Sequence, residues 1–151
     1  MTTPYIYKVM QVNVLRGDTM ELTIDLGFEQ YLGVTMSING VMVPNSIDET
    51  EITAGEPVRK AVQLFMRRHH ENNGHWWIRS EEAAKLGETI VVGGDIYPTF
   101  EDACNCYYGN SVKGFIHNTG LHLTYHGNGD KVTNLKEIKQ NAEVYLVHEN
   151  L

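Results

Sequence analysis

Asp18 is the residue of this chain whose type and position most clearly allow chemistry, because it stands in the turn Gly17-Asp18-Thr19. A carboxylate held at a tight turn can bind a divalent cation, and a bound cation can activate water for hydrolysis. The same residues also make a good hairpin turn without any catalysis. The sequence therefore leaves two interpretations of Asp18 open: a metal ligand, or a turn residue in contact with solvent.

The cysteines and the histidines give weaker signals for metal binding. Cys104 and Cys106 are two residues apart, a spacing that would make a strained disulfide, and tetrahedral zinc would need two more ligands from elsewhere. We therefore expect free thiols. His122 and His126 are four residues apart but fall in an extended segment and a glycine-rich loop, so the helical two-ligand spacing does not apply. We expect most of the histidines to lie at the surface.

The composition predicts one soluble domain, residues 1–151, with an acidic surface. A chain of 151 residues can bury one core but has no room for a second unit. No apolar run approaches the ~20 residues of a membrane helix, and the start of the chain carries no basic and apolar leader, so we expect a cytosolic protein. The formal net charge is −7, whereas proteins that hold a phosphate backbone gather Lys and Arg on one face.

Hydrophobic periodicity predicts that Asp18 lies between two strands of a sheet with one buried face. Apolar residues alternate with polar ones from Val12 to Leu26, and the alternation resumes from Val34 to Ile38. The other predicted strands are residues 5–14, 75–79 and 89–92, with a turn or short helical loop at 81–87, a strand end at 93–95 and a return strand at 96–97.

Apolar residues at spacings of three and four predict three helices. The predicted helices cover residues 56–70, residues 111–117, and the segment from Asn134 onward. Thr53 and Glu56 have the spacing of a capping box that would begin the first of them. Its buried face is predicted to consist of Val58, Ala61, Val62, Phe65 and Met66.

Aromatic residues in the second half of the chain are candidates for binding a partner. Trp76 and Trp77 are adjacent, so in a strand they must point to opposite faces, one into the core and one to the surface. Residues 98–110 are predicted to form an inserted loop rich in Cys and Tyr, and such loops often meet new partners. Large aromatics commonly anchor partners. Phe100, Tyr107 and Tyr108 are therefore further binding candidates.

Several segments together resemble the staphylococcal nuclease family. The family's opening pattern is similar to Gly17-Asp18-Thr19 followed by Ile24-Asp25-Leu26-Gly27-Phe28, a type often carried by phage genomes. Further similarities fall at residues 42–45, 56–62, 85–88 and 115–121, so the resemblance covers nearly the whole chain. It implies an α+β fold: a five-stranded OB-fold Greek-key β-barrel with three helices.

The resemblance also implies where the family's catalytic groups would stand. Family members hold a calcium ion with two aspartates and a backbone carbonyl, place a Glu near the attacking water, and bind the phosphate with two Arg residues. Asp18 matches the first aspartate. The remaining positions are changed: Met42 replaces the second Asp, Val43 the following Thr, Asn45 the Glu, and Ser37 and Glu88 the two Arg. A hard cation needs several oxygen ligands, which this set does not offer.

These changes favour a catalytically inactive member that binds a protein partner or assembles with itself, with a viral origin as one expectation. Its location would then be the host cytoplasm or the virion. We expect no cofactor and no catalytic residue on this hypothesis. Two alternatives stay open. One is a remodelled metal-dependent nuclease that uses Asp18, Asp95, Glu88 and a histidine, with calcium as its cofactor. The other is a non-hydrolytic binder of single-stranded nucleic acid, which the net charge disfavours.

Overall fold

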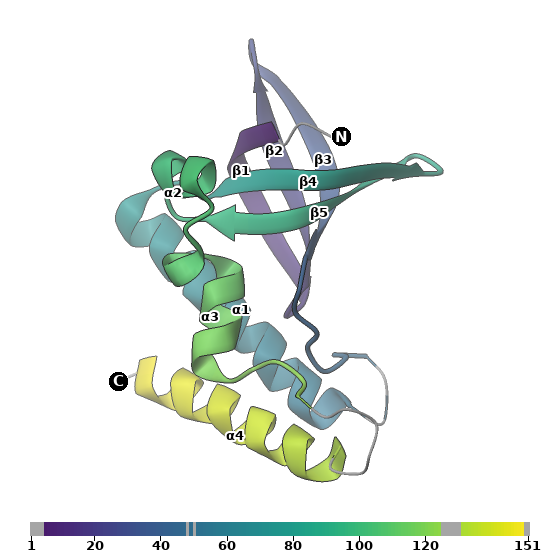
Figure 1. Cartoon of the computed structure of the whole chain (residues 1–151), viewed down its shortest axis with the longest axis vertical. Coiled ribbons are helices and arrows are strands. Elements are labelled where there is room, and N and C mark those ends of the chain that lie inside the picture. The colour runs from purple at the N-terminus through teal and green to yellow at the C-terminus, as the bar shows by residue number, and fades with distance from the viewer. Residues whose placement is uncertain (1–4, 48, 50, 125–130, 150–151) are drawn as a thin grey trace.

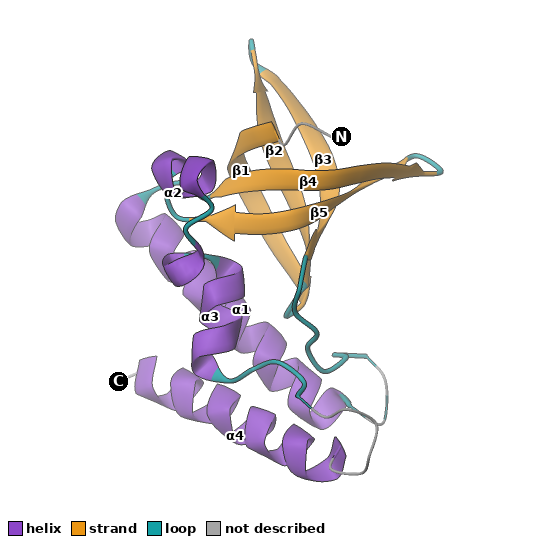
Figure 2. Cartoon of the chain, in the orientation of Figure 1, coloured by secondary structure: helices purple, strands orange, loops and turns teal. Residues whose placement is uncertain are grey.

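Five strands close into a ring, and a group of helices packs against one end of it (Figure 1). The computed structural model describes residues 5–47, 49, 51–124 and 131–149. Its elements in chain order are β1 (Tyr5–Arg16), β2 (Thr19–Gly27), β3 (Gln30–Ile38), α1 (Ile52–Asn73), β4 (Trp77–Leu86), β5 (Thr89–Tyr97), α2 (Phe100–Asn105), the 3₁₀ turn η1 (Tyr108–Asn110), α3 (Val112–Thr119) and α4 (Lys131–Glu149). Figure 2 separates the orange strands from the purple helices.

The strand order around the ring is β1-β2-β3-β5-β4, and β4 pairs with β1 to close it. All neighbours are antiparallel except β3 and β5, which run parallel from Thr35 opposite Val91 to Ile38 opposite Gly94. Parallel neighbours need a long crossover connection. Helix α1 and strand β4 supply it, which places α1 across the end of the ring.

The core lies inside the ring and between the ring and α1. Strands β2 and β3 point alternate residues inward, as their periodicity predicts, and these residues are almost completely buried. They are Met20, Leu22, Ile24, Val34, Met36 and Ile38. Helix α1 turns its predicted face toward them, with Val58, Ala61 and Val62 fully buried. This part of the sequence-based prediction is confirmed.

The turn between β1 and β2 packs directly against α1. A Cβ atom on Gly17 would lie 2.6 Å from Cγ1 of Val58 and 3.1 Å from Cγ2 of Val43. Only a residue without a side chain allows this approach. The close packing fixes the position of Asp18, the next residue, at the junction of the ring with the helix.

The sequence-based prediction is wrong for the β4–β5 hairpin. The sequence predicts a turn or short helical loop at residues 81–87, but β4 continues to Leu86 and pairs with β5, with Ala83 opposite Val92. Strand β5 also runs on past the expected end at 93–95 to Tyr97. Gly94 allows close approach of two strands here, because a Cβ atom would lie 2.0 Å from the carbonyl oxygen of Arg79.

The described residues hold four α-helices, whereas the sequence predicts three. The additional helix, α2, lies within the expected loop at 98–110; Thr99 caps it by accepting a hydrogen bond from the Asp102 N–H. Helix α1 begins at Ile52 without a side-chain cap, so the capping box predicted at Thr53 is wrong. Helix α4 begins at Lys131, three residues before the expected Asn134.

No helix in the described ranges combines the length and the apolar composition that crossing a membrane requires.

Candidate functional site

Asp18 is held by neighbours on both sides of the β1–β2 turn. Its side-chain oxygen Oδ1 lies 3.4 Å from Nε of Arg16 and accepts a hydrogen bond from the Thr19 hydroxyl at 3.0 Å. Its backbone oxygen accepts the N–H of Ile38 at 2.8 Å. The residue is 8% exposed. The carboxylate is thus a nearly buried group whose charge is balanced by a guanidinium of its own turn.

Arg16 also reaches toward the segment that would carry the second family aspartate. Its Nη2 lies 3.5 Å from the carbonyl oxygen of Val43. The Val43 side chain is buried, whereas Met42 is 65% exposed and directs a thioether toward solvent. Arg16 therefore occupies the space between Asp18 and the backbone of this segment. The pairing of Arg16 with Asp18 was not predicted from the sequence, although Arg16 lies only two residues before Asp18.

Asn45 forms hydrogen bonds within its own segment, and Ser37 lies in the β2–β3 pair. The N–H of Asn45 donates to Oε1 of Glu51 at 2.9 Å, and its Oδ1 accepts the N–H of Ile47 at 2.7 Å. Ser37 lies opposite Thr19 across the β2–β3 pair and is partly buried. Ser37 is therefore near the Asp18 turn, and both side chains are neutral.

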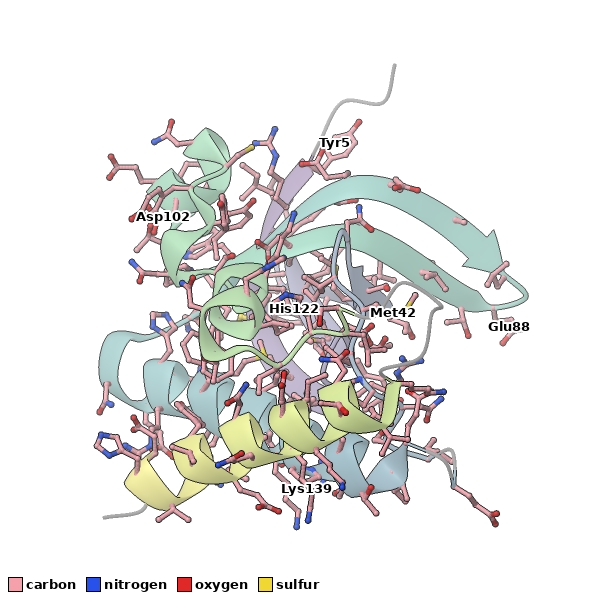
Figure 3. The ribbon with its side chains drawn as sticks, turned by 60° about the horizontal axis from the view of Figure 1, so that its bottom comes forward. Tyr5, Met42, Glu88, Asp102, His122 and Lys139 are labelled. Carbon is pink, nitrogen blue, oxygen red and sulfur yellow. The ribbon has the colours of Figure 1, made fainter. Side chains whose placement is uncertain are left out.

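Glu88 is separate from this group. It follows Gly87 in the turn between β4 and β5 and is exposed at the tip of that hairpin, as Figure 3 shows. The structure therefore brings Ser37 and Val43 close to the Asp18 turn through shared contacts with Thr19 and Arg16. Glu88 is not part of these contacts.

Calcium does not fit the residues that stand at the family positions. Of the two carboxylates, Asp18 is paired with Arg16 and Glu88 lies apart at the hairpin tip, while the exposed Met42 offers sulfur and the buried Val43 offers no side-chain donor. Across the residues that the structure describes, no three His, Cys, Asp or Glu side chains come together in a way that could hold a metal ion. His126, named in the metal hypothesis, lies outside the described residues.

Asp95, the second carboxylate of the remodelled-nuclease hypothesis, lies in β5 and accepts a backbone N–H from the first turn of α3. Its Oδ1 accepts the N–H groups of Ile96 at 2.7 Å and of Lys113 at 3.1 Å. Its Oδ2 is buried without a hydrogen-bond partner in the described part of the chain. Burial raises the pKa of this carboxyl above 3.8, although the hydrogen bonds from Ser111, Lys113 and Ile96 oppose the shift.

We expect Asp95→Asn to change how stability depends on pH. A carboxyl whose pKa is raised by folding binds its proton more tightly in the native state, so its stabilising contribution is complete below 3.8 and is lost as pH rises through the raised value. The free energy of unfolding of the native protein, relative to that of the variant, should therefore increase as pH falls from neutrality. Urea denaturation at a series of pH values measures this difference. A difference that decreases on acidification would contradict the prediction.

The two tryptophans have different environments. Trp76 is 2% exposed, and its indole N–H donates to the carbonyl oxygen of Met66 at 2.9 Å. It belongs to the core and not to the surface, which corrects its place among the binding candidates. Trp77 is partly buried; its ring meets the edge of Phe100 at 5.2 Å, and Lys8 Nζ lies 6.0 Å from its centroid.

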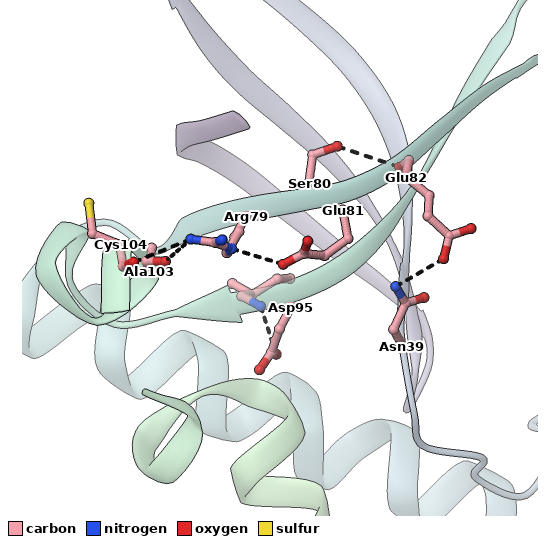
Figure 4. Close-up of polar contacts among 9 residues, drawn as sticks. Asn39, Arg79, Ser80, Glu81, Glu82, Asp95, Ala103 and Cys104 are labelled. Carbon is pink, nitrogen blue, oxygen red and sulfur yellow. Dashed lines mark hydrogen bonds and ion pairs between the residues drawn. The ribbon is translucent and has the colours of Figure 1, made fainter. Parts of the chain in front are cut away.

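The segment formed by α2 and η1 exposes the remaining aromatic candidates. Phe100, Tyr107 and Tyr108 are each more than half exposed. Arg79 of β4 fixes α2 by donating from Nη1 to the carbonyl oxygens of Ala103 at 3.0 Å and Cys104 at 3.3 Å (Figure 4).

The cysteines of this segment, Cys104 and Cys106, are free and exposed. Their predicted state as free thiols is thus confirmed.

The structure is that of an α+β protein built on a ring of five strands. The Asp18 carboxylate is paired with Arg16 at the β1–β2 turn, and an exposed aromatic segment lies beside β4. The chain matches no family model and no curated protein. Its function is therefore inferred from the residues and their geometry.

Proposed function

We propose that the chain is a non-hydrolytic domain of OB-fold type that acts by binding a protein partner, which includes a second copy of itself. The order β1-β2-β3-β5-β4, with one parallel pair and α1 inserted between β3 and β4, supports the OB-fold part of this proposal. The resemblance to the staphylococcal nuclease family, in a degenerate form, is part of the same proposal.

The ion pair between Arg16 and Asp18 is the observation that carries the non-hydrolytic part. Metal-assisted phosphoryl chemistry needs a cation beside the carboxylate and further positive groups on the phosphate. In this chain the guanidinium takes the place beside the carboxylate, and it also reaches the Val43 carbonyl. A divalent cation would have to displace it, and the described residues offer no group of three or more His, Cys, Asp or Glu side chains to hold the cation instead.

The outer face of the ring argues against nucleic acid as the partner. A polar cleft of about 450 Å³ lies over β1, β2, β3 and the start of β5, and Glu21 and Glu88 both line it. Neither Lys nor Arg is among the described residues that line it. A phosphate backbone would meet repulsion on this face, because nucleic-acid binding relies on neutralising cations.

A protein partner suits a different surface, which we call the aromatic edge: Trp77, Phe100, Tyr107 and Tyr108. These side chains combine apolar area with few rotatable bonds, so they can anchor a partner at low entropic cost. The edge is fixed to the ring through Arg79, which ties α2 to β4. Within it, Trp77 and Phe100 contact each other with 5.2 Å between ring centroids, so this part of the edge is held against the ring.

Incubation of the protein with supercoiled plasmid and calcium, magnesium or manganese tests the proposal. We expect no cleavage beyond that given by Asp18→Asn protein purified in the same way, because the Asp18 carboxylate is already paired with Arg16. Arg16→Met serves as a second comparison, since it frees the carboxylate. Strong cleavage by the native protein that Asp18→Asn abolishes would overturn the proposal in favour of the remodelled nuclease.

A further inference from the structure

A large cleft lies where the four helices meet, away from the Asp18 turn. Its volume is about 910 Å³, within the range of small-molecule sites. The C-terminal half of α1, the loop before α2, helix α3 and the end of α4 all contribute residues to it. In Figure 1 these segments lie on the left side of the molecule. The aromatic edge is formed by other residues, so this cleft is a separate feature.

Aromatic rings form a continuous wall of the cleft. Phe65 stacks on Phe115 with 4.1 Å between ring centroids and lies 5.5 Å from the ring of Trp76. Phe115 in turn meets the edge of Tyr145 at 4.9 Å. The wall thus runs from α1 through α3 to α4. Because Trp76 is 2% and Phe115 8% exposed, the partly buried rings of Phe65 and Tyr145 supply the accessible part of this wall, and such rings favour a flat aromatic ligand or a cation.

His69 adds one polar group to this wall. Its ring lies 4.3 Å from the ring of Trp76, and its Nε2 is buried without a hydrogen-bond partner among the described residues. Burial lowers the pKa of His69 from its ordinary value, although backbone groups of His75 and Pro98 oppose the shift. A buried polar atom without a partner is costly unless a ligand or water satisfies it.

The charges around the cleft sum to a negative value. Arg68 is neutralised by Glu149, with 2.8 Å between Nη1 and Oε2. Asp102 lines the cleft from the first turn of α2 and forms no ion pair within the described ranges. Asp102 therefore carries the charge that has no opposite partner among the described residues of the cleft.

We propose that this cleft binds a small organic cation that carries a planar aromatic group. The aromatic part would lie against the wall of Phe65, Phe115 and Tyr145, and a ligand N–H or acceptor would satisfy Nε2 of His69. The positive group would face Asp102, where both the carboxylate and the nearby ring faces attract it. This binding goes beyond the proposed function and does not depend on it.

Benzamidinium is a suitable probe, with neutral benzamide and anionic benzoate as comparisons of nearly equal size. In a Trp77→Phe background the fluorescence of the chain reports on Trp76, which lines the cleft. We expect saturable quenching by benzamidinium, weaker quenching by benzamide, and none by benzoate. The chemical shift of the Trp76 indole N–H should move with the same ligand order.

Asp102→Asn and Glu101→Gln form a matched pair of variants. Both remove one negative charge from the first turn of α2, but only Asp102 lines the cleft. We expect Asp102→Asn to weaken benzamidinium binding about five- to tenfold, the size of one charge pair near a surface, and Glu101→Gln to change it less than about twofold. The proposal would be overturned if the two variants lost the same affinity for benzamidinium, or if benzoate bound more tightly than benzamidinium. Absence of saturable binding at millimolar benzamidinium would also overturn it. None of these outcomes bears on plasmid cleavage.

Discussion

Replacing Trp76 by alanine is expected to lower the free energy of unfolding by about 3–5 kcal/mol, because a buried ring is lost and a cavity remains. The ring contacts Phe65 and His69, and its N–H donates to Met66. Truncation also leaves the Met66 carbonyl without this donor. Urea denaturation at constant pH measures the loss, and an unchanged m-value would show that the unfolding transition is comparable.

Trp77→Ala is the control for this prediction, since the ring of Trp77 is only partly buried. It removes the edge contact with Phe100 and the approach of Lys8, which together are worth about 1 kcal/mol. If Trp77→Ala cost as much as Trp76→Ala, the assignment of Trp76 to the core and of Trp77 to the aromatic edge would be wrong.

Gly114→Ala is expected to destabilise the protein by about 3 kcal/mol, at the upper end for overpacking. A Cβ atom at this position would lie 1.8 Å from the carbonyl oxygen of Tyr108 and 3.1 Å from that of Gly109. Both neighbours are backbone atoms of η1, so α3 would have to move away from it. Helix propensity alone predicts the opposite sign, because alanine in a helix is favoured over glycine by roughly 1 kcal/mol.

Gly33→Ala provides the comparison. Gly33 lies in β3 with an ordinary φ, and no atom lies within 4 Å of the Cβ position. The substitution should change the free energy of unfolding by no more than about 0.5 kcal/mol. A thermal melt in which Gly114→Ala is as stable as the native protein would contradict the packing of α3 against η1.

The parts of the fold that the sequence predicts correctly are those in which local pattern and tertiary packing agree. The alternation around Met20, Leu22 and Ile24 has the period of a strand, and the ring buries that same face. The apolar face of α1 is a second case, because the ring, α3 and α4 together cover it. Neither depends on knowing which distant segment is the neighbour.

The β4–β5 hairpin shows why other parts could not be predicted. Glu81-Glu82-Ala83-Ala84 favours a helix locally, but pairing of Ala83 with Val92 and Ala84 with Val91 decides the structure. Gly93-Gly94 has the local pattern of a strand end, although Gly94 permits close approach to Arg79. In both places a contact with a distant residue outweighs the local signal.

The candidate sites, like the fold, could be predicted from the sequence only in part. The sequence shows that Asp18 stands alone where a metal site needs several carboxylates. It does not show that Arg16 balances the charge of Asp18, because that pair depends on how Gly17 packs against Val58. The cleft beside His69 could not be foreseen, since it exists only where segments far apart in sequence meet.

A calcium titration followed through the backbone amide signals of Asp18 and Thr19 tests the central claim most directly. If Arg16 holds the carboxylate, these signals should show no saturable shift at millimolar calcium, and Asp18→Asn protein should behave in the same way. A saturable shift at Asp18 and Thr19 that disappears in Asp18→Asn would show that the turn binds the cation, and would contradict the claim that Arg16 has taken the cation's place.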